Sequence, residues 1–249
     1  MVLEYAEGGN FNNYLDKNYE RFDWFNGLKV LTNIIKGLSE IHQNQMVHRD
    51  FHVGNILFVK PLTYSSYNPY KIMINMIASP EVLRGRTYTQ AADIYSFGMI
   101  MYVVATGRQP FADRAHDEVL VLNICNGIRP EINEKIIPKC HIDLMKRCWY
   151  LNPDNRPNSI EIKELIDQFY HSLDQEYEVE EQQYYEIEKQ FNETQEYRKE
   201  NLLSIKNNQL TIHTQAIYTV HLDYLTLIQR IFQNMIPWRL LILQIYKLL

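Results

Sequence analysis

The stretch HRDFHVGN, residues 48–55, decides how this sequence is interpreted. It places Asp50 and Asn55 five positions apart in a short segment that follows a helical pattern. Transfer of a phosphoryl group from a nucleotide needs a carboxylate that orients the acceptor hydroxyl and accepts its proton. It also needs a neutral oxygen that helps to bind Mg²⁺. Asp50 and Asn55 have this chemistry, although the octapeptide alone also fits an exposed turn or a surface ion pair.

Three further motifs follow in the chain: SPEV at 79–82, DIYSFGMIMY at 93–102 and CWYLNPDNRP at 148–157. With HRDFHVGN they make residues 1–170 resemble the large C-terminal lobe of protein kinases. The Cys-Trp-x-x-x-Pro-x-x-Arg-Pro pattern is most similar to the tyrosine-kinase-like and tyrosine kinase branches. The resemblance implies a protein kinase-like fold, ATP and Mg²⁺ as cofactors, and a protein substrate.

The resemblance implies roles for the residues of the first motif. Asp50 would be the catalytic base and Asn55 a Mg²⁺ ligand, while Arg49 would contact the activation segment, often through a phosphate on it. His48 would pack in the internal apolar column of the lobe. His52 stands where serine/threonine kinases usually have a lysine, and the tyrosine kinase arrangement is also absent, so the analogy favours Ser/Thr as acceptor.

Three charged residues have structural roles by the same resemblance. Asp93 would accept hydrogen bonds from the backbone of the loop around Asp50, which explains a carboxylate in an otherwise apolar helix. Glu81 and Arg156 would form a buried ion pair that ties the activation segment to the lower helices.

The first ten residues, MVLEYAEGGN, resemble the last strand of the small lobe and the hinge. Leu3 would stand at the gatekeeper position, and the backbone groups of Glu4 and Ala6 would face the adenine. Leu57 would lie under the adenine ring. Without the other motifs, VLEY would be interpreted as an ordinary core strand.

The sequence departs from the kinase pattern in two ways. No Gly-rich loop or phosphate-binding lysine precedes the hinge, so most of the small lobe is expected to be missing. Residues 60–78 contain no acidic residue, although family members carry the main Mg²⁺ carboxylate there. Because phosphoryl transfer depends on positioning and counter-charge, we expect impaired activity. The alternatives are an inactive pseudokinase that binds protein partners, or an incomplete gene product in which this stretch is misread intervening sequence.

The hydrophobic pattern predicts a mainly α fold with residual short strands. Apolar periodicity and capping residues predict helices at 23–43, 90–106, 115–126, 140–150 and 158–170. Two short strands are predicted at 46–48 and 56–59.

The chain is predicted to contain three parts: a truncated kinase-like domain at 1–170, an acidic helical linker at 174–200 and an apolar tail at 201–249. The linker is interpreted first as a charged, solvated helix, with a short coiled-coil contact as the alternative. The tail is predicted to pack against the domain rather than to lie on a membrane surface. Its charges at Asp223, Arg230 and Arg239 argue against a transmembrane span.

The composition favours a soluble protein that is neither secreted nor bound to nucleic acid. The net charge of −5 gives no electrostatic reason for a nucleic-acid partner. Three cysteines without a closely spaced pair indicate neither a disulfide framework nor a zinc site. A reducing, cytoplasmic location is therefore expected, and the oligomeric state stays open.

Overall fold

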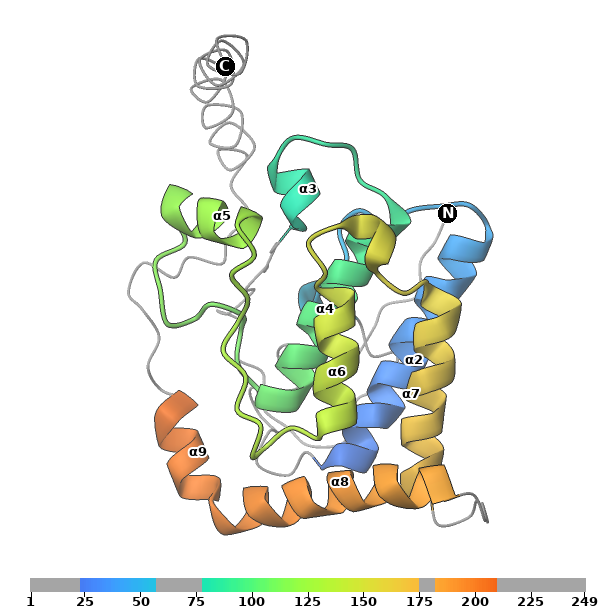
Figure 1. Ribbon diagram of the computed structural model, residues 1–249, viewed down its shortest axis with the longest axis vertical. Helices are drawn as coiled ribbons and strands as arrows, with labels where there is room; N and C mark the ends of the chain where they lie inside the picture. The colour runs from blue at the N-terminus through green and yellow to red at the C-terminus, as the bar shows by residue number, and fades with distance from the viewer. Residues whose placement is uncertain (1–22, 57–77, 175–181, 210–249) are drawn as a thin grey trace, which may run out of the picture.

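The computed structural model describes residues 23–56, 78–174 and 182–209, and the described part is built from helices (Figure 1). The α-helices are α2 (Trp24–Gln43), α3 (Pro80–Leu83), α4 (Gln90–Thr106), α5 (Glu118–Cys125), α6 (Lys139–Cys148), α7 (Ser159–Leu173), α8 (Gln182–Glu200) and α9 (Leu202–Gln209). Two short 3₁₀ helices, η2 (Val53–Asn55) and η3 (Pro153–Asn155), lie in the connections.

Helix α4 is the centre of the packing. It contacts α2 and α6, and α2 in turn packs along α7 (Figure 1). Almost all side chains of α4 are buried, as the sequence predicted, and Gly107 ends the helix in the left-handed conformation at φ 65°. Gly98 lets α4 approach α6, because a Cβ there would lie 2.8 Å from the Cβ of Cys148. The apolar sequence of α4 is therefore explained by contacts on several sides.

The predicted helix at 23–43 is confirmed as α2, and the side chain of Asp23 accepts a hydrogen bond from the Asn26 amide. The helix predicted at 158–170 is also confirmed, as α7, and the Asn158 side chain caps it by accepting from the amides of Ile160 and Glu161. The carboxylate of Glu161 pairs with Arg147 on α6. Side-chain oxygens at both helix starts thus satisfy amides that have no partner within the helix.

Other predicted boundaries shift by a few residues. The helix predicted at 115–126 begins at Glu118, because the side chain of Asp117 caps it. The helix predicted at 140–150 ends at Cys148. Residues 46–48 form no strand in the described part of the chain, so that prediction is wrong. A strand needs a neighbour to pair with, and most of the second predicted strand, at 56–59, lies outside the described residues.

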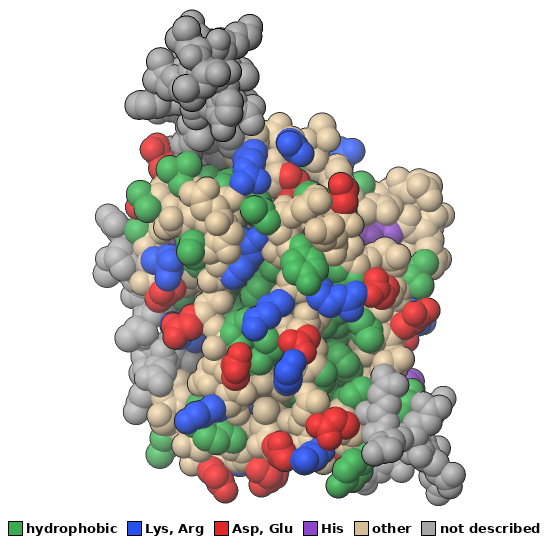
Figure 2. Space-filling view, viewed as in Figure 1, with side chains coloured by type: hydrophobic (Ala, Val, Ile, Leu, Met, Phe, Trp, Pro, Cys, Tyr) green, Lys and Arg blue, Asp and Glu red, His purple; other side chains and the backbone are tan. Residues whose placement is uncertain are grey.

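Helix α8 corrects the interpretation of the acidic linker as a charged, solvated helix, because one of its faces is buried. It runs across one end of the molecule and packs on α6 and α7 (Figure 1). Phe191 is fully buried, and its ring lies 5.2 Å from that of Trp24 at the start of α2. Arg198 is buried too: its guanidinium lies 5.3 Å from the Trp24 ring and donates to the Ala105 carbonyl at 3.1 Å. The outer face of α8 does carry charged side chains of both signs, along the lower edge of the molecule in Figure 2.

Most of the tail that is predicted to pack against the domain, residues 210–249, lies outside the described residues. That packing stays a prediction, as do the three domain boundaries.

Candidate active site

The HRDFHVGN segment forms a loop that is fixed by one buried carboxylate. Asp93, in the first turn of α4, accepts hydrogen bonds from the amides of His48 at 2.7 Å and Arg49 at 3.0 Å. A third contact joins its Oδ2 to Nε2 of His42 at 3.0 Å. The predicted role of Asp93 is therefore confirmed. Asp93 is only 2% exposed, and its three partners compensate for the burial of its carboxylate. The carboxylate thereby fixes the part of the loop that directly precedes Asp50.

The loop presents Asp50 with both carboxylate oxygens in contact with neighbours. Nδ2 of Asn55 donates to Oδ2 of Asp50 at 2.7 Å and to the Asp50 backbone carbonyl at 2.9 Å. Nε2 of His52 lies 3.4 Å from Oδ1. The predicted pair of Asp50 and Asn55 is thus brought together, and the Asp50 side chain is 53% exposed, so a substrate can reach it.

The backbone of the loop is unusual at Arg49, which has a φ of 69° although it is not glycine. The amides of His48 and of Arg49 itself donate to Asp93, and these two hydrogen bonds offset the strain of the left-handed conformation. Its side chain is exposed. Residues 57–77, which form most of the segment that Arg49 is predicted to contact, lie outside the described part.

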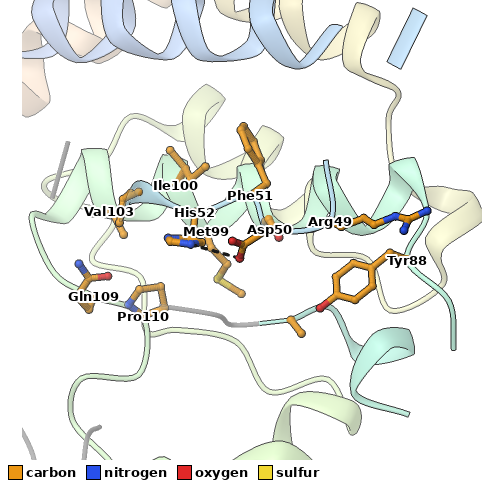
Figure 3. A pocket seen from close by; sticks show the side chains of 13 residues that line it. Arg49, Asp50, Phe51, His52, Tyr88, Met99, Ile100, Val103, Gln109 and Pro110 are labelled. Atoms are coloured by element: carbon orange, nitrogen blue, oxygen red, sulfur yellow. Dashed lines mark ion pairs between the residues drawn. The ribbon is translucent and has the colours of Figure 1, made fainter. Parts of the chain in front are cut away.

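A pocket opens beside Asp50 (Figure 3). One side is formed by the loop and the other by apolar side chains of α4, followed by the turn after that helix. Its lining includes Asp50, His52, Met99, Ile100, Val103, Gln109 and Pro110.

Two titratable groups near the pocket are neutral. Burial lowers the pKa of the His52 imidazole below 6.5, although the Asp50 charge acts in the opposite direction. Burial, followed by the charges of Asp50 and Asp93, raises the pKa of Tyr88. His52 is therefore mainly uncharged at pH 7, and Asp50 has no cationic partner in His52.

The predicted ion pair between Glu81 and Arg156 is confirmed. The guanidinium contacts both carboxylate oxygens, at 2.7 and 2.8 Å, and Arg156 also donates to the carbonyls of Ala91 and Tyr150. Its charged group lies over the ring of Tyr95 at 5.2 Å. This network holds the short helix α3, which follows the segment at 57–77, against the N-terminal end of α4.

Sequence reasoning missed two of these contacts. His42 shares the Asp93 carboxylate, and the available signal was a histidine on the buried side of α2. His52 was noted only for the lysine that it replaces, whereas the structure places it against Asp50. His48 is half-buried and packs on Phe51 at 5.1 Å. The nucleotide-binding residues predicted from the hinge, Glu4 and Ala6, lie outside the described residues, together with Leu3 and Leu57.

The described residues fit a Mg²⁺ site in which the protein supplies few ligands and the substrate phosphates supply others. They do not form a site made of protein ligands alone. The amide nitrogen of Asn55 makes both hydrogen bonds to Asp50, which leaves its carbonyl oxygen for a hard cation. Within the described ranges, no group of three or more His, Cys, Asp or Glu side chains is arranged to hold a metal ion. Mg²⁺ is commonly held by few protein ligands together with substrate phosphates, and one oxygen from Asn55 agrees with that pattern.

The comparisons with known proteins agree with the geometry. The family described as the protein kinase domain matches residues 1–171, so the chain belongs to the protein kinase family.

Its relatives include serine/threonine kinases of plants, amoebae and a virus. The chain is 27% identical over 181 residues to serine/threonine-protein kinase STY17 of Arabidopsis thaliana, which covers 68% of this chain and 32% of that protein. It is 30% identical over 191 residues to the putative serine/threonine-protein kinase/receptor R831 of Acanthamoeba polyphaga mimivirus, covering 70% of this chain and 12% of that protein. It is 29% identical over 190 residues to the probable serine/threonine-protein kinase roco5 of Dictyostelium discoideum, and the match covers 65% of this chain and 7% of that protein. The chain therefore spans a third or less of these relatives.

Among the helices in the described ranges, none combines the length and the apolar character that a membrane span needs.

Proposed function

We propose that this chain carries the catalytic loop of an ATP-dependent protein kinase of the tyrosine-kinase-like branch that phosphorylates serine or threonine. The observation that carries the proposal is the joint placement of Asp50 and Asn55 on a loop anchored to Asp93. The names of the relatives support Ser/Thr over Tyr as the acceptor. A cytoplasmic location belongs to the same proposal.

In this proposal the exposed Asp50 carboxylate orients the acceptor hydroxyl and accepts its proton. The hydrogen bond from Asn55 fixes one carboxylate oxygen, and His52 lies against the other at 3.4 Å, which limits rotation of the group. Bound Mg²⁺ would supply counter-charge to the phosphates, with the carbonyl oxygen of Asn55 as one ligand. Glu4, Ala6 and Leu57 would hold the adenine, and Arg49 would bind the activation segment.

Weak transfer is expected, because residues 60–78 lack the carboxylate that would hold the metal ion. Loss of one well-placed electrostatic group commonly reduces turnover about a hundredfold to a thousandfold. The test is incubation of the full chain with radiolabelled ATP, Mg²⁺ and a mixed protein substrate, followed by analysis of the labelled amino acids. Label on serine or threonine supports the proposal, and label confined to tyrosine contradicts the assigned acceptor.

A second candidate function is an inactive scaffold that binds protein partners, and the missing acidic residue in 60–78 favours it. Mg²⁺ and ATP distinguish the two. A chain that binds the nucleotide is stabilised by RT ln(1 + [L]/Kd), about 2.7 kcal/mol at a hundred times Kd, and its melting temperature rises with the ATP concentration. A scaffold without a nucleotide site has the same melting temperature with and without ATP.

A further inference from the structure

Helix α8 caps the starts of two other helices with its own side chains (Figure 1). The side chain of Gln195 accepts from the amide of Trp24, the first residue of α2, at 3.3 Å. The side chain of Gln190 accepts from the amide of Cys140, in the first turn of α6, at 2.9 Å. First-turn amides have no partner within their own helix, and Pro138, which precedes α6, offers no side-chain cap. Protection of these two amides from water therefore depends on α8.

A buried histidine lies in the interface between α8 and the helices that it caps. His141, in the first turn of α6, is fully buried, and its ring lies 5.2 Å from that of Trp24. Two side chains of α8 approach the same Trp24 ring: the ring of Phe191 at 5.2 Å and the guanidinium of Arg198 at 5.3 Å. Docking of α8 thus brings a cation to the surroundings of His141.

The surroundings of His141 fit only its neutral form. Nε2 lies 3.3 Å from the carbonyl of Met101 on α4, so this nitrogen carries the proton of the neutral ring and donates it. Nδ1 is buried and has no hydrogen-bond partner among the described residues. A second proton would create a buried donor without an acceptor and a second positive charge near Arg198. Departure of α8 removes the Arg198 charge and opens this side of the interface to water.

We propose that α8 is an acid-sensitive latch: protonation of His141 releases α8 from the domain, while the central helices stay folded. Burial lowers the pKa of the His141 imidazole to about 4; the Met101 carbonyl opposes this shift and the Arg198 charge adds to it. Docking of α8 is therefore favoured in full above pH 6.5, and this preference is lost as the pH falls from 6.5 to about 4. Between pH 7 and pH 5 the equilibrium constant for release should rise about twentyfold.

The neighbouring groups leave this response to the histidine. In the described part of the chain, the groups that face it are one cation and uncharged groups: Arg198 from α8, the Trp24 ring from α2 and the Met101 carbonyl from α4. Lys139 and Asp143, on the same helix as His141, are exposed and pair with each other. The pair of Glu81 with Arg156 persists down to pH 4.5, because the pKa of Glu81 lies below that value.

The latch is connected to the candidate active site through α2. Gln195 caps the first residue of this helix, and His42, near its last residue, contacts Asp93. Release of α8 therefore removes a support from the helix that supplies one of the three contacts of Asp93.

Amide hydrogen exchange of the full chain at pH 7 and pH 5, corrected for the intrinsic effect of pH, tests the latch. The amides of Trp24, Cys140 and α8 should lose about twentyfold in protection at pH 5, while those in the middle of α4 keep theirs. In His141→Gln, the side chain can still donate to the Met101 carbonyl but does not titrate, so protection should be the same at both pH values.

The matched control is His116→Gln. His116 precedes α5, and its Nε2 also contacts a carbonyl, that of Phe111 at 3.2 Å. This variant should lose protection at pH 5 as the wild type does. In Arg198→Gln, which retains the histidine, the loss of protection between pH 7 and pH 5 should be smaller than in the wild type.

Three results would overturn the latch: wild-type protection that is equal at both pH values, a loss that extends equally to α4, or a loss that persists in His141→Gln. If His141→Gln does not fold, Arg198→Gln decides, and a loss as large as that of the wild type would overturn it.

Discussion

At the scale of single residues, two buried carboxylates position the loop of Asp50 and the short helix α3. Asp93 accepts from two loop amides and contacts His42, while Glu81 is paired with Arg156 through both of its oxygens. Each carboxylate links segments that are more than forty residues apart in the sequence. Removing one partner would leave charge or hydrogen-bonding groups buried without compensation, which costs far more than loss of a surface ion pair.

The ion pair of Glu81 gives a stability prediction with a defined pH dependence. Burial alone would raise the pKa of the Glu81 carboxyl, but hydrogen bonds and charge from Arg156 outweigh burial and hold the pKa below 4.5. The pair therefore stabilises the fold above pH 4.5, and this contribution is lost as the pH falls through the folded-state pKa. Glu81→Gln should lower the free energy of unfolding by about 3 kcal/mol at pH 7.

Urea denaturation of the wild type and Glu81→Gln at several pH values checks this prediction. The difference in unfolding free energy should narrow as the pH drops below 4.5. A difference that is constant from neutral to acid pH would show that the charge of Glu81 does not stabilise the fold.

Residue roles could be predicted from the sequence where a motif fixes both partners. Asp93, Glu81 and Arg156 stand in three recognisable segments, so their contacts followed from the resemblance. The contact between His52 and Asp50 did not, because sequence spacing on an irregular loop gives no direction for a side chain. The apolar wall of the pocket was hidden as well, since α4 is apolar on almost every side and its sequence does not show which face borders Asp50.

At the scale of elements, α8 is a structural part of the described molecule beyond the family match that ends at residue 171. Its buried side chains fill the space between α2, α6 and α7. Besides the aromatic contacts of Phe191, the side chain of Gln195 accepts from the Trp24 amide at 3.3 Å, and that of Gln190 accepts from Cys140 at 2.9 Å. The start of α2 thus depends on a helix that lies about 170 residues later in the chain.

Substitution of Phe191 tests this packing. Phe191→Ala should reduce the free energy of unfolding by about 3 to 5 kcal/mol, because it leaves a cavity beside Trp24 and Phe169. The matched control is Tyr185→Ala on the same helix, where the residue is 68% exposed and the change should alter the free energy of unfolding by no more than about 0.5 kcal/mol. Thermal or chemical denaturation gives both values. Equal effects of the two substitutions would mean that α8 does not pack on the domain as described.

The burial of α8 could be predicted only in part. Its helical character followed from its length and charge, and Phe191 and Ile187 were visible as apolar positions. The charged residues between them favoured a solvated helix, whereas burial of Arg198 is compensated by the Trp24 ring and the Ala105 carbonyl. Partners that lie far away in the sequence cannot be identified from local periodicity.

At the scale of the whole molecule, two links position the candidate site. Asp93 holds the loop that carries Asp50, and the ion pair between Glu81 and Arg156 holds α3 beside the same central helix. The mainly α fold and most helices were predicted, because capping residues and apolar periodicity act locally. The sequence also showed that residues 60–78 contain no acidic residue. The fold does not depend on that residue, whereas phosphoryl transfer does.

The central claim is that Asp50 serves as the catalytic base of a weak protein kinase. It is tested most directly by radiolabelled phosphate transfer from ATP, at high concentrations of the full chain, with the wild type, Asp50→Asn and Asp154→Asn. Asp154 is an exposed residue of η3 and provides the matched control. Asp50→Asn should reduce transfer about a hundredfold or more, and Asp154→Asn should leave it unchanged. Transfer by the wild type that persists in Asp50→Asn, or no transfer by any of the three, would contradict the claim.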